Sequence, residues 1–221
     1  MVVSGCRLLI VVAAMLAPTG LAPTGLALTG LALTGAPAIA QPRKDPDWPC
    51  IQPEVPTLSV VQVWTGPSVD EAMTAWRDDE EIAGLARRLS ARRMPIEDAE
   101  DAVRDFSARL DPSRKEERLT QLFAGIFTTL NAERSEVMNG IKHYARRQKA
   151  MAEEIRMQQS RLSDLRQASP NSPQAQELKT DLLVQVRIFD DRRHSLTYVC
   201  EVPSLIEQRL FALARVIQAE L

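Results

Sequence analysis

A long stretch without helix breakers constrains the fold of this chain more than any other feature. Between Pro112 and Pro170 the sequence contains no proline and only two glycines, Gly125 and Gly140. Apolar residues recur there at alternating steps of three and four, which is a heptad pattern with one stutter. A helix of about 55 residues would be about 80 Å long. A compact domain of this size does not reach that diameter, so part of the helix must project or fold back.

A turn over residues 168–173 supplies the fold-back. The sequence there is Ala-Ser-Pro-Asn-Ser-Pro, which is typical of a loop. Ser172 followed by Pro173 is typical of a helix start, with the serine as N-cap and the proline in the first turn. Helical spacing of apolar residues resumes directly afterwards. The sequence therefore predicts two long helices that pair antiparallel about this turn.

The register of that pairing places Cys200 near the level of Ile141. Pro203 then predicts the start of a separate last helix, because proline is favoured in a first turn. We therefore expect an antiparallel coiled-coil hairpin over residues 141–199. We expect residues 200–221 to form a C-terminal helix that belongs to a helical body.

The same spacing predicts which side chains line the paired helices. On the first helix the predicted line passes through Glu133, Val137 and Gln148, and on the second it passes through Phe189 and Arg192. Polar side chains at such positions cost stability but fix the register of two helices. A seam of this kind suits a thin, partly solvated hairpin.

A proline-rich segment precedes the helices. Residues 41–67 contain six prolines, which remove hydrogen-bond donors and fix φ. Tryptophan and aliphatic side chains are interspersed among them, so the segment is predicted to run extended as a strap over the helical body of residues 68–140. Cys50 would pin it there. Residues 58–64 also have the composition of a β-strand, although they have no evident partner strand.

Shorter helices are predicted within the body because each follows a capping residue. The capping residues are Ser68, Asp78 or Asp79, and Asp111 followed by Pro112, while Pro95 itself is predicted to start a helix. The helix after Ser68 is expected to reach Arg77. The predicted core consists of the apolar residues at helical spacing: Ile82, Leu85, Leu89, Val103, Phe106, Leu122, Phe123, Ile126, Phe127, Leu130, Ile206, Leu210 and Leu213.

Residues 1–40 have the organisation of a cleavable signal peptide. Arg7 precedes the apolar run of residues 8–16, and the segment closes on Ala-Ile-Ala at residues 38–40. Residues 16–35 contain four copies of a five-residue unit, Leu-Ala-x-Thr-Gly, which are too short to build a core. An uncleaved membrane anchor is the alternative, but prolines and glycines interrupt the length that a span requires. We expect a periplasmic protein with no stable membrane span after cleavage.

The mature part would contain two cysteines, Cys50 and Cys200. In an exported protein two cysteines most simply form one disulfide. Closing a loop of about 150 residues stabilises a fold by up to about 5 kcal/mol in the chain-entropy model. An intermolecular bridge stays open. Neither histidine has zinc-ligand spacing to a cysteine, and there is no haem attachment motif.

The net charge of the chain and its lack of catalytic motifs limit the functions that we expect. The chain has 27 Lys and Arg against 29 Asp and Glu, and without Arg7 the balance is 26 against 29. A weakly acidic protein is a poor ligand for nucleic acid, so no such partner is expected. The sequence lacks a P-loop, a nucleophile elbow, a zinc-protease motif and a dinucleotide fingerprint. We therefore expect no catalytic residues, no metal site and no cofactor.

Two groups of basic residues are the candidate contacts for a partner or an anion. The first is Arg87, Arg88, Arg92 and Arg93, and the second is Lys142, Arg146, Arg147 and Lys149. The alternative for the first group is complementation of a helix dipole. The alternative for the second group is a solvated helix face near acids of the hairpin.

Two segments carry a resemblance to a known group of proteins. The first is Asp-Trp-Pro-Cys at residues 47–50, with Val55-Pro56, Leu58-Ser59, Trp64 and Gly66-Pro67. The second is Tyr-Val-Cys-Glu-Val-Pro at residues 198–203, with Glu-Gln-Arg at residues 207–209. They resemble the opening and closing sections of a family of uncharacterised secreted α-helical proteobacterial proteins. That family has no assigned activity, so the resemblance implies no functional residue.

Together these features predict an all-α protein: a small helical bundle with a projecting hairpin and an N-terminal proline-rich strap. The expected function is that of an exported scaffold, adaptor or chaperone-like interaction protein that lacks catalytic activity. Its partner is expected to be a protein of the cell envelope, bound through the hairpin. The alternatives are a periplasmic binder of a small anionic ligand or envelope polymer, and a homodimer formed through the hairpin.

Overall fold

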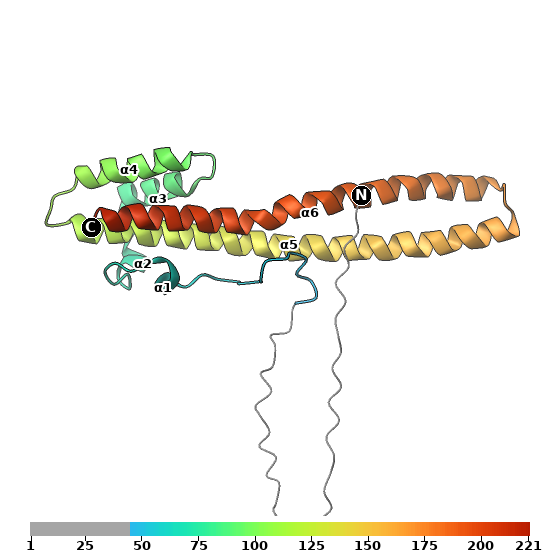
Figure 1. Ribbon diagram of the computed structural model, residues 1–221, viewed down its shortest axis with the longest axis horizontal. Coiled ribbons are helices and arrows are strands. Elements are labelled where there is room, and N and C mark those ends of the chain that lie inside the picture. The colour runs from blue at the N-terminus through green and yellow to red at the C-terminus, as the bar shows by residue number, and fades with distance from the viewer. Residues whose placement is uncertain (1–44) are drawn as a thin grey trace, which may run out of the picture. The chain divides into compact units, whose positions relative to one another are not determined.

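The computed structural model of the protein describes residues 45–221, which lie within one compact unit, Arg43–Leu221. The described part is all-α and contains no strand (Figure 1). Its helices are α1 (Val60–Val63), α2 (Ala72–Ala75), α3 (Glu80–Ser90), α4 (Ile96–Ala108), α5 (Lys115–Ala168) and α6 (Pro173–Ala219). The predicted signal peptide and its repeats lie outside the described residues.

The two long helices pair antiparallel, as predicted (Figure 1). α5 has 54 residues, and α6 begins at Pro173 after the predicted turn. Ser172 is the N-cap, because its side chain accepts a hydrogen bond of 3.2 Å from the backbone N–H of Ala175. The amide of Gln148 donates to the carbonyl of Phe189 at 3.2 Å, which fixes the register between the helices.

The predicted break before a last helix is wrong. α6 continues through Pro203 to Ala219, so the hairpin and the C-terminal part of the body are one helix. An interior proline costs a helix about 3 kcal/mol, because it removes a hydrogen bond and crowds the preceding turn. Pro203 is itself buried, and Ile206 and Leu210 beyond it are completely buried in the core. Packing of this segment therefore outweighs the local preference to break.

The predicted helix starts are confirmed at two places and wrong at two others. Asp79 caps α3, with its carboxylate 3.1 Å from the backbone N–H of Ile82, and Pro95 precedes α4. Ser68 caps no helix, because its hydroxyl bonds Asp70 and α2 starts only at Ala72. Asp111 caps a turn, which delays the start of α5 to Lys115.

The body surrounds the inner ends of the paired helices (Figure 1). α3 and α4 lie on one side of them, and α1 and α2 lie on the other. Within residues 58–64, Val60–Val63 form one helical turn, α1, and no strand is present, so the alternative of a strand is wrong. Every one of the thirteen predicted core residues is buried. The indole of Trp64 stacks on Phe123 with their centroids 4.0 Å apart, which joins the end of the strap to that core.

The outer part of the hairpin has a separate and much smaller apolar cluster. Its buried members are Ile155, Leu162, Ala175 and Leu182. Between Leu182 and Pro203 no residue of α6 is buried, and the predicted seam residue Arg192 is exposed. α5 covers one side of α6 in this region and the strap reaches it around Cys200, which leaves much of α6 in solvent, including the predicted seam position Arg192.

The predicted line along α5 is also displaced where the helix leaves the body. Arg134 and Met138 are buried there, whereas Glu133 and Val137 are only half-buried. The heptad pattern assumes one facing helix. α5 instead meets both α6 and the strap at this level, so the face that it buries is shifted.

Candidate functional site

The strap lies along α5 and runs antiparallel to it. Near the body, the side chain of Asn131 accepts from the backbone N–H of Leu58 at 3.0 Å and donates to its carbonyl at 3.4 Å. One turn further along, the hydroxyl of Ser135 donates to the carbonyl of Pro56 at 3.1 Å. These bonds satisfy strap groups that have no regular secondary-structure partner.

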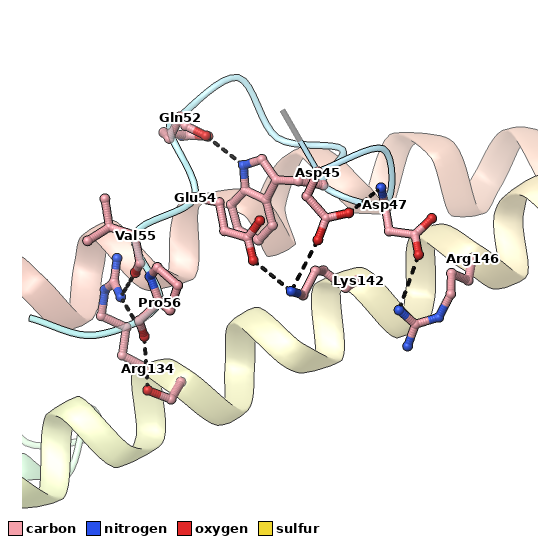
Figure 2. Close-up of polar contacts among 11 residues, drawn as sticks. Asp45, Asp47, Gln52, Glu54, Val55, Pro56, Arg134, Lys142 and Arg146 are labelled. Atoms are coloured by element: carbon pink, nitrogen blue, oxygen red, sulfur yellow. Dashed lines mark hydrogen bonds and ion pairs between the residues drawn. The ribbon is translucent and has the colours of Figure 1, made fainter. Parts of the chain in front are cut away.

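Arg134 on α5 contacts the strap at the base of the hairpin (Figure 2), and it also contacts Glu207 of α6. Its guanidinium is 97% buried, since only 3% of the residue is exposed. Nε is 2.7 Å from a carboxylate oxygen of Glu207 on α6, and Nη1 donates to the strap carbonyl of Val55. Burying an arginine costs least when its donors and its charge are both matched. Arg134 therefore locks the strap, α5 and α6 into one arrangement.

An acidic part of the strap covers most of the second basic group (Figure 2). The Lys142 ammonium is 2.7 Å from Glu54 and 3.3 Å from Asp45. Asp47 lies 3.4 Å from Arg146 and 3.0 Å from the Lys149 ammonium. Three of the four predicted contact residues on this face thus bind the protein's own strap. The acids that they meet belong to the strap, in place of the hairpin acids considered from the sequence.

The fourth member, Arg147, is exposed and has no ion pair among residues 45–221. Within this group, Arg147 is the side chain that the strap leaves to solvent.

The strap contacts shift the pKa values of the groups that make them. The backbone N–H of Asp47 and then the Lys142 ammonium lower the pKa of Asp45. The Lys149 ammonium and then Arg146 lower the pKa of Asp47. The hydrogen bond to Glu54, followed by that to Asp45, raises the pKa of Lys142. Each shift favours the charged form, so the ion pairs persist across neutral pH.

A disulfide fixes the other side of the strap to α6. Cys50 and Cys200 are bonded, with their Cα atoms 5.6 Å apart and 150 residues between them in sequence. The separation lies within the range of ordinary disulfides, and the pairing predicted from the sequence is confirmed. A cysteine pair of this kind is compatible with an oxidising compartment. Two residues before the bond, Trp48 donates its indole N–H to the carbonyl of Gln52 at 2.6 Å.

The first basic group is dispersed at the end of α3. Arg87, Arg88, Arg92 and Arg93 are all exposed. Arg92 alone has an ion pair among the described residues, with its Nε 3.0 Å from Glu133 of α5. Arg92 also contributes to the wall of a cavity between α4 and α6. The four side chains therefore do not form one shared anion site.

The outer half of α6 presents an exposed apolar surface, which we name the outer stripe. It consists of Val184, Ile188 and Tyr198, which are 55%, 41% and 73% exposed. Their spacings of four and ten residues keep them on one face of the helix. Val184 lies two residues after buried Leu182, about 200° further round the helix. The outer stripe thus faces away from α5.

His194 is exposed beside Asp190, Asp191 and Arg193. No group of three or more metal-ligating side chains is assembled within residues 45–221. Across the same residues, no helix combines the length and apolar composition needed to cross a membrane.

Comparison with known proteins adds no relative. The chain matches no protein-family model, no curated protein and no solved structure. The resemblance to secreted proteobacterial proteins therefore stays a prediction.

Sequence reasoning missed the residues that organise this region: Asn131, Arg134, Glu207 and Arg209. The available signal was weak but present. Arg134 and Arg209 are charged residues within otherwise apolar helical stretches, where a charge is buried only if it is paired. Their partners are largely backbone carbonyls, which no pattern of side chains reveals.

Proposed function

We propose that the protein is an exported periplasmic scaffold or adaptor that acts by binding and docks a protein of the cell envelope on its hairpin. The observation that carries the proposal is the outer stripe. Soluble proteins bury large apolar side chains, and several exposed on one face of one helix are typical of an interaction surface. A partner helix can dock on apolar side chains that recur at helical spacing.

The way in which the hairpin is braced supports this assignment. The strap reaches along α5 as far as Lys149, and the disulfide holds α6 at Cys200. From Lys149 to the end of α5 the helix continues for about 30 Å without contact from strap or body. Because the core of the body is complete without this extension, the outer hairpin has no evident role in closing the core.

The stripe also suggests the kind of partner. Charged residues of both signs, Arg187, Asp191 and Arg193, flank it. A mixed border does not select a strongly acidic or basic surface. The partner that fits is an amphipathic helix with an apolar face of similar length, packed in the manner of a coiled coil.

Site-specific photo-crosslinking in cells that export the full chain tests the proposal. A photoreactive phenylalanine is placed at Ile188 or Tyr198, and the matched control position is Lys179, which is exposed on a different face of α6. We expect one discrete heavier product from positions 188 and 198 and none from 179. Equal products from all three positions, or no product, would overturn the proposal. A product of twice the chain mass would replace the envelope partner with a second copy.

A second variant separates docking from folding. Replacing residues 152–185 with a short Gly-Ser turn removes the outer hairpin and keeps the strap contacts of Lys149 and the disulfide. We expect the shortened protein to remain helical and disulfide-bonded but to lose the crosslink from position 198. Retention of that crosslink would show that Ile188 and Tyr198, which the variant keeps, dock the partner without residues 152–185.

A further inference from the structure

One buried cation of the body has no matching anion. Arg209 on α6 is 8% exposed, and its Nε and Nη1 atoms donate to the carbonyls of Leu89 and Met94 at 2.6 and 2.8 Å. Its Nη2 atom is buried without a hydrogen-bond partner among residues 45–221. No carboxylate of the described part forms an ion pair with it, since Glu133 is bonded to Arg92. Burying a charge that only neutral carbonyls oppose is costly.

The electrostatic state of Arg209 reflects this deficit. Burial lowers the pKa of Arg209, and the charge of Glu133 only partly opposes the effect. Arg209, Arg92 and Glu133 together carry one net positive charge. Two exposed carboxylates, Glu97 and Asp98, lie in the first turn of α4. An anion of single charge would offset the net charge of the three groups.

A cavity adjoins this cation. It has a volume of about 480 Å³ and is lined by Arg92, Ile96, Leu205, Gln208, Arg209 and Ala212. That volume is within the range of small-ligand sites, and such sites combine an apolar wall with a few polar groups. Three of the lining residues are apolar and three can donate hydrogen bonds.

The start of α4 adds a second source of positive potential. Ile96 is the first residue of α4, and its N-cap is Pro95, which provides no side-chain acceptor for the first-turn N–H groups. Unsatisfied N–H groups at a helix start favour an anion. Ile96 at the helix start lines the cavity together with Arg92 and Arg209, while Leu205 and Ala212 provide apolar surface.

We propose that this cavity binds a small monocarboxylate with a short hydrocarbon group, its carboxylate among Arg92, Arg209 and the start of α4 and its hydrocarbon against Ile96, Leu205 and Ala212. The single net positive charge of Arg209, Arg92 and Glu133 selects a monoanion over a phosphate dianion. The apolar wall selects an organic acid over an inorganic anion. The site lies on the body and does not depend on docking at the hairpin.

Isothermal titration calorimetry of the exported protein with sodium hexanoate tests the site. We expect saturable binding of one hexanoate per chain. We expect 1-hexanol, which lacks the charge, and inorganic phosphate, which lacks the hydrocarbon, each to bind at least tenfold more weakly. Absence of saturable hexanoate binding, or equal binding of either comparison compound, would overturn the proposal.

Variants locate the binding within the cavity. Ala212→Phe fills the cavity without changing its charge and should abolish hexanoate binding. Arg92→Gln removes one donor and should weaken binding at least fivefold. Arg87→Gln, an exposed arginine of the same helix end that does not line the cavity, is the matched control and should bind as the native protein does. Unchanged affinity in both Ala212→Phe and Arg92→Gln would overturn the proposal, and circular dichroism verifies that each variant is folded.

Discussion

The inner and outer halves of the α5–α6 hairpin have the same secondary structure but differ in what surrounds them. In the inner half, α1 to α4 and the strap cover the paired helices, and Phe123, Leu130 and Leu210 are completely buried. In the outer half only the two helices meet, and the cluster around Leu162 and Leu182 retains some exposure. Heptad spacing therefore determines that the helices pair, whereas the additional layers determine how stable each half is.

The boundary between the halves is as informative as the halves themselves. The disulfide, Arg134 and the ion pairs of the strap all lie within the short zone where the body ends. Elements that are far apart in sequence are fastened there by covalent and polar contacts. Variants of these contacts and of the two apolar clusters test whether the halves differ in stability.

Loss of the disulfide should have the largest effect. Replacing both Cys50 and Cys200 with serine removes a link across 150 residues. The chain-entropy model predicts a loss of up to about 5 kcal/mol in the free energy of unfolding. Urea denaturation of the double variant and of the oxidised native protein measures the difference. A loss below about 1 kcal/mol would show that other contacts hold the strap.

Matched truncations should separate the two halves directly. Phe123→Ala opens a cavity in the completely buried inner core beside Trp64 and should cost about 3–5 kcal/mol. Leu162→Ala in the outer cluster should cost roughly 1–2 kcal/mol, because the thin two-helix seam can collapse and is partly solvated. Chemical denaturation measures both changes. Equal costs would contradict the distinction between the halves.

The two glycines of α5 should respond in opposite directions. A Cβ atom at Gly125 would lie 2.9 Å from the Cβ of Ala86 and 3.1 Å from the Trp76 ring, so Gly125→Ala should destabilise the inner half by about 1–3 kcal/mol. A Cβ at Gly140 would meet nothing within 4 Å, so Gly140→Ala should stabilise the helix by about 0.5–1 kcal/mol. Thermal unfolding of both variants checks the sign of each effect.

Acidification should produce the smallest and most local effect. Since the pKa values of Asp45 and Asp47 are lowered in the folded protein, their contribution to stability is present above about pH 3.8 and is lost as pH falls below it. The raised pKa of Lys142 has the opposite sense, so its contribution is lost only above about pH 10.5. Hydrogen exchange at pH 7 and pH 3, corrected for intrinsic rates, should show residues 45–58 losing protection before the body does.

Asp47→Asn provides the control for that experiment. The variant removes the partner of both Arg146 and Lys149 while leaving Glu54 and Lys142 in place. The variant should have weaker strap protection at pH 7 and a smaller difference in strap protection between pH 7 and pH 3. The protection of the body should stay unchanged. Strap protection that is the same at both pH values in the native protein would show that the disulfide alone retains the strap.

Local chemistry determined much of the fold. The absence of prolines along residues 113–169 fixed the long helix, Ser172 and Pro173 fixed the turn, and helical spacing identified the thirteen core residues. Each of these features depends on neighbours in sequence, which is why pattern alone was sufficient. With Cys6 assigned to the predicted signal peptide, Cys50 and Cys200 left one simplest pairing, and the structure confirms it.

Tertiary structure decided the rest, because contacts between distant segments override local preference. Packing in the body carries α6 through Pro203, and the strap shifts the buried face of α5 onto Arg134. The second basic group was visible in the sequence, but the identity of its partners was not, since Lys142 and Asp45 are 97 residues apart. The uncompensated charge of Arg209 is a tertiary property too, because it arises only when α3, α4 and α6 meet around one side chain.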